Sequence, residues 1–189
     1  MLSVIIATHE SERALVRTLA GLVPGAAAGV VREVVVADAG SRDATAEVAD
    51  FAGCNVLVSP ASLGVRLKAA AAVARSPWLM FLRPGTLLDA TWIDDATQFV
   101  ETDADGSRAA VFRPGRGTAT QSVLLEALAL LRLALVGRPC AAQGLLIARH
   151  LYDGAGGHRE HADPETDLLR RLGRRRIAVL RSVAVSTQP

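Results

Sequence analysis

The chain has 189 residues, of which 50% are hydrophobic, 21% charged and only 4% aromatic, and its formal net charge is +2. This length suits one domain, and so large an apolar share excludes a disordered chain. The net charge by itself says little about partners, but part of the positive excess is concentrated near the C-terminus, whereas nucleic-acid binders usually spread a basic face over the domain and interleave it with aromatic side chains.

In the first hundred residues, four continuous apolar runs alternate with helical patterns. The runs predict buried strands over residues 2–7, 30–37, 55–58 and 78–82. The helical patterns begin after Ser11 and end at Pro24 and Gly25, and then cover residues 44–51, 62–74 and 90–101. This alternation predicts an α/β fold, with a mostly parallel sheet flanked by helices.

The rest of the chain is less regular. Strands are predicted over residues 109–112, 144–148 and 177–183, helices over 122–136 and 165–172, and loops over 113–120 and 154–163. No change of composition marks a linker, so we expect a single domain over residues 1–189.

No secretory leader pattern precedes the first predicted strand. The apolar run over residues 123–136 is too short to span a bilayer and is broken by Glu126 and Arg132. We therefore expect a cytoplasmic protein without a transmembrane segment. The helix predicted over 122–136 is apolar nearly all round, so burial, a homodimer interface and a contact with the inner membrane surface are all open interpretations. Burial or dimerisation is favoured.

Three further features have a simple structural interpretation beside a functional one. An arginine run at positions 170, 171, 174, 175 and 176 is interpreted as a solvated helix end, rather than as a phosphate or acidic-lipid site. His158, Glu160, His161 and Asp163 could hold a metal, but their mixed spacing favours a solvated loop. For Trp92, packing in the core is favoured over stacking on an acceptor sugar.

The side chains with the clearest chemical content follow the predicted strands. Thr8 follows the first strand, Asp38 the second and Arg83 the fourth. Ligands bind at the carboxyl ends of strands in open parallel sheets. After Asp38, Gly40 allows a tight turn and Ser41 can satisfy free N–H groups of the next helix, although a simple capped turn explains that segment equally well. Neither a G-x-G-x-x-G motif nor a P-loop is present, which disfavours a dinucleotide cofactor or a P-loop nucleotide site.

Three segments in these regions resemble a known family. They are residues 3–10 (SVIIATHE), residues 34–38 and 40–45 (VVVAD and GSRDAT), and residues 78–82 (WLMFL). In order and spacing they resemble the N-terminal half of the family 2 glycosyltransferases, and residues 143–147 and 166–172 resemble that family more loosely. The resemblance implies a GT-A type fold, a nucleotide-diphosphate sugar donor and a role in cell-envelope or polysaccharide biosynthesis. It also implies a nucleotide-binding half, 1–103, and an acceptor half, 104–189.

The resemblance also implies where the substrates bind. Thr8 and Asp38 fall where such proteins hold the nucleoside, with Glu10 beside them and Gly40 and Ser41 in the same turn. The sugar and diphosphate are expected near residues 83–86. The acceptor, an unidentified glycan, lipid or small molecule, is expected near Glu165 and Asp167.

Several acidic residues of the family are missing or displaced in this chain. The acidic pair, or its His-Ala-Asp variant, that carries a divalent cation after the fourth strand is replaced by RPGT at residues 83–86. Mg²⁺ or Mn²⁺ beside a diphosphate normally takes at least one carboxylate, so we expect no metal site unless Asp89, Asp94 or Asp95 folds back to supply one. Ala142 stands where an acidic residue often occurs, and the family's later Glu-Asp pair reads Pro164-Glu165.

Two functions fit these departures. In the first, Arg83, with Lys68 or Arg66 on the preceding helix, replaces the charge of the metal, and Glu165 removes the acceptor proton. In the second, the fold is a catalytically inactive module that binds a nucleotide or a protein partner. A nucleotidyltransferase is a third and weaker interpretation, because residues 8–12 (THESE) are acidic rather than glycine-rich and basic.

Overall fold

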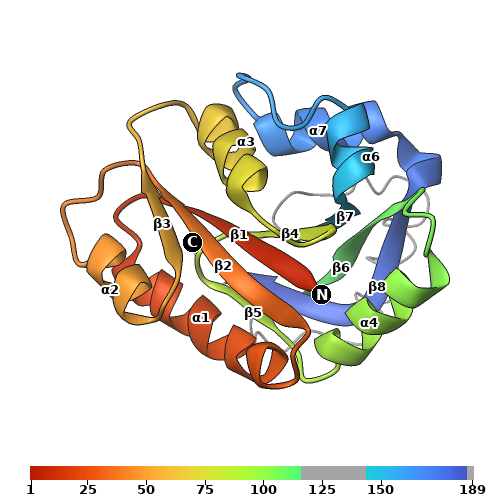
Figure 1. Cartoon of the computed structure of the whole chain (residues 1–189), viewed down its shortest axis with the longest axis horizontal. Coiled ribbons are helices and arrows are strands. Elements are labelled where there is room, and N and C mark those ends of the chain that lie inside the picture. The colour runs from red at the N-terminus through yellow and green to blue at the C-terminus, as the bar shows by residue number, and fades with distance from the viewer. Residues whose placement is uncertain (116–143, 187–189) are drawn as a thin grey trace, which may run out of the picture.

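The computed structural model describes residues 1–115 and 144–186 (Figure 1). The helix predicted over 122–136, most of the loop predicted over 113–120, and Ala142 lie outside the described residues.

The first four strands and their helices follow the predicted alternation closely. The strands are β1 (Leu2–Thr8), β2 (Val31–Asp38), β3 (Asn55–Val58) and β4 (Trp78–Leu82). The helices are α1 (Glu12–Ala27), α2 (Thr45–Phe51), α3 (Leu63–Val73) and α4 (Trp92–Thr102). Strands such as β4, which is buried along its whole length, are apolar throughout because helices cover both faces of the sheet.

The remaining described elements add four strands and shorter helices. The strands are β5 (Thr86–Leu88), β6 (Ala109–Gly115), β7 (Leu145–Ala148) and β8 (Ile177–Ser186). The helices are α6 (Arg149–Gly154), α7 (Pro164–Leu172) and the 3-10 turn η2 (Arg174–Arg176). None of the helices in the described ranges is long and apolar enough to cross a membrane.

These strands form one eight-stranded sheet in the order β3-β2-β1-β4-β7-β6-β8-β5. β1 to β4 are mutually parallel, β7 runs antiparallel to β4 and to β6, and β8 is parallel to β6 but antiparallel to β5. Figure 1 shows α1, α2 and α4 on one face of the sheet, and α3, α6 and α7 on the other. The expected α/β fold with a mostly parallel sheet flanked by helices is confirmed.

The prediction that α1 ends at Pro24 and Gly25 is wrong, because the helix continues to Ala27. Pro24 lies in the last turn, where a missing N–H removes a single hydrogen bond, and its carbonyl oxygen accepts from the N–H of Ala28 at 2.9 Å. Gly25 is pressed against Trp92, since a Cβ at this position would lie 2.5 Å from the indole ring. Trp92 itself is 2% exposed, so its predicted place in the core is confirmed.

The structure also contains elements that the sequence pattern did not predict. β5 is only three residues long and pairs with β8 near the other end of the chain, Thr86 lying opposite Ser186. α6 is six residues long, too short to show a helical period, and it extends to Gly154, which was predicted to begin a loop. Both elements depend on contacts that are distant in sequence, which local patterns do not record.

Candidate functional site

The polar residues predicted at the strand ends lie along one edge of the sheet. Thr8 ends β1, Asp38 ends β2 and Arg83 follows β4 directly, and Thr8 and Asp38 lie opposite each other in the strand register. β1 separates β2 from β4, so Asp38 and Arg83 follow strands two spacings apart, about 10 Å. This edge is where open parallel sheets bind ligands.

The Asp38 carboxylate is the centre of a hydrogen-bond network at this edge. Its Oδ1 accepts from the Thr8 hydroxyl at 2.7 Å and from the Ser41 hydroxyl at 2.6 Å. Its Oδ2 accepts from the N–H groups of Gly40 at 2.8 Å and Ser41 at 2.7 Å. Burial pushes the pKa of Asp38 upward, but these hydrogen bonds together outweigh it and leave the pKa below its ordinary value. Asp38 is therefore an ionised group that is 1% exposed and fully hydrogen-bonded.

The loops after β1 and β2 are tied together around this carboxylate. The N–H of Glu10 donates to the Ser41 hydroxyl at 2.9 Å, and a Glu10 carboxylate oxygen accepts from the N–H of Arg42 at 2.8 Å. Glu10 has a φ of 47° and Gly40 a φ of 89°, so both loops turn through the left-handed region. Thr8, Glu10, Asp38, Gly40 and Ser41, all predicted from the sequence, thus form one contiguous cluster.

Arg66 on α3, rather than Lys68, contacts the strand ends. Its Nη1 donates to the carbonyl oxygen of Thr8 at 3.0 Å and to that of Ala37 at 2.5 Å. Burial lowers the pKa of Arg66, while the charge of Asp38 acts in the opposite direction. Arg66 therefore supports the ends of β1 and β2, a role that its position on a helix could not reveal.

Lys68 lies in a different place on α3. It lines a groove of about 510 Å³ together with His158, Arg159 and Glu160 from the loop before α7, and with apolar residues of α3. This loop approaches α3 so closely that a Cβ at Gly64 would lie 1.9 Å from the carbonyl oxygen of Arg159.

Arg83 and Glu165, which are 82 positions apart in sequence, form an ion pair. The Arg83 Nε donates to Oε2 of Glu165 at 2.9 Å, and an Nη group of Arg83 donates to the same oxygen. The Arg83 side chain is 44% exposed, whereas that of Glu165 is 13% exposed. Burial raises the pKa of Glu165 above its ordinary value, and the hydrogen bond and charge of Arg83 act against this rise.

Glu165 is held in the first turn of α7 by a well-defined helix start. Asp163 is the N-cap, its carboxylate accepts from the N–H of Thr166 at 3.1 Å, and Pro164 opens the helix. Asp167, the other predicted acidic residue of this helix, accepts from Arg171 Nε at 2.9 Å. Arg171 also donates to the carbonyl oxygens of Ala155 and Gly157, so it fastens the preceding loop to the helix.

The solvated loop predicted over 154–163 is wrong for His158, which is 1% exposed. The Nδ1 of His158 lies 3.0 Å from the Tyr152 hydroxyl oxygen, and its ring packs edge-on against Phe81 of β4, with ring centroids 4.7 Å apart. Burial lowers the pKa of His158 to about 4 and raises that of Tyr152 to about 12. A core histidine in a polar loop has no local signal, because its partners come from β4 and α6.

The residues near Arg83 do not fit a divalent cation beside a diphosphate. The position after β4 presents a guanidinium group, which repels a cation, and the Glu165 carboxylate is paired with it. Within residues 1–115 and 144–186, no group of three His, Cys, Asp or Glu residues is placed to hold a metal ion. Hard cations need several oxygen ligands, which this donor set does not supply.

Asp89 and Asp95, which could have restored a metal site, instead hold strand β8. The Asp89 carboxylate accepts from the N–H of Val183 at 2.6 Å and from the hydroxyl of Thr91 at 2.8 Å. The Asp95 carboxylate accepts from the N–H of Ser182 at 2.6 Å. Both carboxylates therefore fix the last strand to the start of α4.

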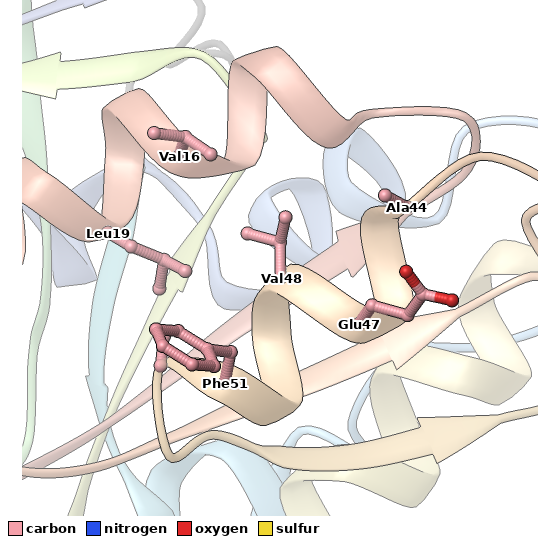
Figure 2. Close-up of a pocket in the computed structure, with 7 residues that line it drawn as sticks. Val16, Leu19, Ala44, Glu47, Val48 and Phe51 are labelled. Atoms are coloured by element: carbon pink, nitrogen blue, oxygen red, sulfur yellow. The ribbon is translucent and has the colours of Figure 1, made fainter.

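A separate apolar pocket lies between α1 and α2 (Figure 2). It has a volume of about 490 Å³, and Figure 2 shows Leu19, Val48 and Phe51 gathered along it. Glu47 is the charged residue of its lining. A nucleotide diphosphate needs several convergent polar groups, so this pocket does not fit such a ligand.

Comparison with known proteins gives one family match. The family model described as "Glycosyl transferase family 2" matches residues 3–128, which is more than half of the chain. No curated protein gives a match.

Solved structures resemble the chain over nearly its whole length. Glucosyl-3-phosphoglycerate synthase from Mycobacterium tuberculosis, in complex with Mn²⁺, UDP and glucosyl-3-phosphoglycerate, has a TM-score of 0.70 at 20% identity, with 100% of this chain and 72% of that chain covered. The same synthase with Mn²⁺ and UDP-glucose has a TM-score of 0.68 at 20% identity, with 100% and 72% covered. Residues 1–349 of TarS from S. aureus have a TM-score of 0.74 at 18% identity, with 98% of this chain and 60% of that chain covered. At these identities the likeness shows a shared fold.

Proposed function

The chain belongs to glycosyl transferase family 2, and from this premise we propose that it transfers a sugar from a nucleotide-diphosphate donor to an acceptor hydroxyl. The observation that carries the proposal is the Arg83–Glu165 pair at the carboxyl edge of the sheet, beside the network around Asp38. These groups offer a cation for the diphosphate and a base for the acceptor.

The nucleoside is proposed to bind over the loops that contain Thr8, Glu10, Asp38, Gly40 and Ser41. A carboxylate has about four acceptor positions, and all four on Asp38 are used within the chain. Two of its donors are hydroxyl groups, on Thr8 and Ser41, which can rotate and leave room for a base or ribose donor. A uridine or guanosine nucleotide fits this chemistry, and the synthase of similar fold was crystallised with UDP.

The diphosphate is proposed to bind Arg83 directly, without a metal ion between them. A guanidinium group binds phosphate through two parallel hydrogen bonds and stabilises the charge that develops on a departing diphosphate. Lys68, on the preceding helix, is the second candidate cation. The synthase of similar fold binds Mn²⁺ with its nucleotide, so the arginine after β4 would be a replacement for that charge in this chain.

Glu165 is proposed as the general base. It would take the proton of the acceptor hydroxyl while that oxygen attacks the anomeric carbon of the sugar. The bond from this carbon to the diphosphate oxygen breaks, and the nucleoside diphosphate leaves with the electron pair, which inverts the anomeric centre. The raised pKa of Glu165 makes it a stronger base than an ordinary glutamate. Asp167 is proposed to contact the acceptor through its free carboxylate edge while Arg171 holds the other edge.

The acceptor is proposed by class alone, as a hydroxyl of a glycan, a lipid or a small molecule. A role in cell-envelope or polysaccharide synthesis, a cytoplasmic location with contact at the inner membrane surface, and a homodimer belong to the same proposal.

Calorimetric titration of the purified protein tests the donor site directly. UDP, GDP and their common sugar conjugates are added with Mn²⁺ and again with EDTA. We expect binding that persists in EDTA and weakens at least tenfold in Arg83→Ala, the change expected when one charged hydrogen bond of about 1.5–3 kcal/mol is lost. Arg75→Ala is the matched control, because Arg75 is an exposed arginine, 74% accessible, that precedes β4 at the opposite edge of the sheet.

A binding module without transfer is the alternative, and a permanent Arg83–Glu165 pair would favour it. Donor hydrolysis or transfer in EDTA, lost in Glu165→Gln, supports the enzyme. Nucleotide binding without turnover under any metal supports the inactive module. No nucleotide binding at all contradicts the enzyme and leaves an inactive module that binds a protein partner.

A further inference from the structure

The ion pair joins the two side chains to which the proposed function gives different tasks. Arg83 is to hold the diphosphate and Glu165 is to deprotonate the acceptor, yet in the structure each engages the other. Glu165 is a weak base while this pair is intact, because its carboxylate is held by a guanidinium, and the edge of Arg83 that it occupies is closed to phosphate.

The two partners of the pair differ in how exposed they are and in how their backbone is held. Glu165 is 13% exposed and stands in the first turn of α7, whose start is fixed by the Asp163 cap and by Pro164. Arg83 is 44% exposed, lies in the turn after β4, and has a long side chain with several rotatable bonds. A change in the pairing therefore requires rotation of Arg83 rather than movement of the helix.

Arg83 binds Glu165 through the Nε and Nη edge of its guanidinium group, and arginine can bind phosphate through the same edge. Nε and one Nη group of Arg83 both point to a single oxygen of Glu165. Nε and Nη together form one of the two-pronged edges through which arginine binds carboxylate and phosphate. Glu165 and a diphosphate would compete for this edge.

We propose that Glu165 occupies the place of the donor diphosphate on Arg83, so that donor binding draws Arg83 away and releases the Glu165 carboxylate for the acceptor. This inference rests on the proposed function and deepens it. It makes the base available only when the donor is bound, and it requires that the donor bind before the acceptor proton is removed.

The electrostatics of the pair act in the same direction. Burial raises the pKa of Glu165, and Arg83 acts against that rise. Removing Arg83 from the carboxylate raises its pKa further, which strengthens Glu165 as a base at the moment the donor is in place. The charge of Arg83 also lowers the pKa of Asp163. A diphosphate would therefore compete with two carboxylates, those of Glu165 and Asp163, for Arg83.

The test is a double-mutant cycle of nucleotide affinity. UDP and GDP are titrated in EDTA into the wild type, Glu165→Gln, Arg83→Gln and the double variant. Glutamine keeps the shape of the Glu165 side chain but removes its charge, and thermal unfolding verifies that each variant is folded. Glu101→Gln is the matched control, since it removes an exposed carboxylate from α4, on the opposite face of the sheet from α7.

We expect Glu165→Gln to tighten nucleotide binding by at least fivefold, the lower end of coupling between linked sites, and Glu101→Gln to leave it unchanged. In the Arg83→Gln background, Glu165→Gln should leave the nucleotide affinity unchanged, because the guanidinium group for which Glu165 and the diphosphate compete is absent. Tightening that persists in this background would show simple repulsion between Glu165 and the nucleotide, and would overturn the inference.

The outcomes distinguish a failure of the competition at Arg83 from a failure of the proposed sugar transfer. If Arg83→Gln weakens binding but Glu165→Gln leaves the affinity unchanged or lower, the competition is refuted while the donor site stands. If neither the wild type nor any variant binds UDP or GDP, the proposed function itself is wrong.

Discussion

Asp38 and His158 show how differently single residues can be understood from sequence. Asp38 follows an apolar strand and precedes Gly40 and Ser41, so its place at a strand end was predictable, and its hydrogen bonds are mostly to neighbours in sequence. His158 lies in a polar segment, and its burial depends on Phe81 and Tyr152 from other elements. No local pattern announces such a residue.

The buried His158 makes stability depend on pH in a specific window. Because burial lowers its pKa from 6.5 to about 4, the unfolded chain binds this proton more readily than the folded one. The free energy of unfolding should therefore fall as the pH drops from about 6.5 to about 4, by about 3 kcal/mol in total. Urea unfolding across this range measures the loss.

His158→Gln provides the comparison for this pH dependence, because glutamine keeps a hydrogen-bonding group near Tyr152 but does not titrate. Its slope between pH 6.5 and 4 should be clearly smaller than that of the wild type. An unchanged slope would mean that His158 is not the group responsible.

Among the elements, α3 joins the two sides of the site. Its Arg66 supports the ends of β1 and β2, and its Gly64 touches the loop that leads to α7. The position of Glu165 opposite Arg83 therefore depends on how closely that loop can approach α3. The helix itself was predictable from its composition, but the contact was not.

Substitution of Gly64 tests the importance of this contact. In Gly64→Ala the new methyl group would lie 1.9 Å from the carbonyl oxygen of Arg159, so the loop must move. We expect a loss of about 1–3 kcal/mol in the free energy of unfolding, as is typical of overpacking. Denaturant unfolding at neutral pH measures it.

Gly21→Ala is the matched control, since Gly21 is also helical, on α1, and a Cβ at this position would meet nothing within 4 Å. Replacing glycine by alanine in an open helix site should stabilise the chain by about 0.5–1 kcal/mol. Equal effects of the two substitutions would contradict the packing argument.

At the scale of the whole molecule, the two halves share one sheet. β4 of the first half pairs with β7 of the second, and β5 of the first half pairs with β8 near the end of the chain. The first half therefore contributes the outermost strand beside β8, and among the described residues the strands of both halves join in one sheet.

This interleaving predicts a single cooperative unfolding transition. Fluorescence of Trp78 and Trp92 reports on the first half, whereas far-UV circular dichroism reports on all helices and strands. We expect both signals to give the same midpoint in urea, as two-state unfolding requires. Two separated transitions would contradict the single domain.

The sequence by itself determined the alternation of strands and helices, the mostly parallel sheet, the family resemblance and the cluster around Asp38. Apolar periodicity and turn residues make the elements visible in the chain, and the alternation of strands and helices places the ends of β1 and β2 side by side, so that Thr8 and Asp38 could be expected to meet. Tertiary structure alone decided that β5 pairs with β8, that Arg66 supports the strand ends, and that Asp89 and Asp95 hold β8. It also decided that Arg83 meets Glu165. These contacts join residues far apart in sequence, and their energy comes from burial and geometry that exist only once the chain has folded.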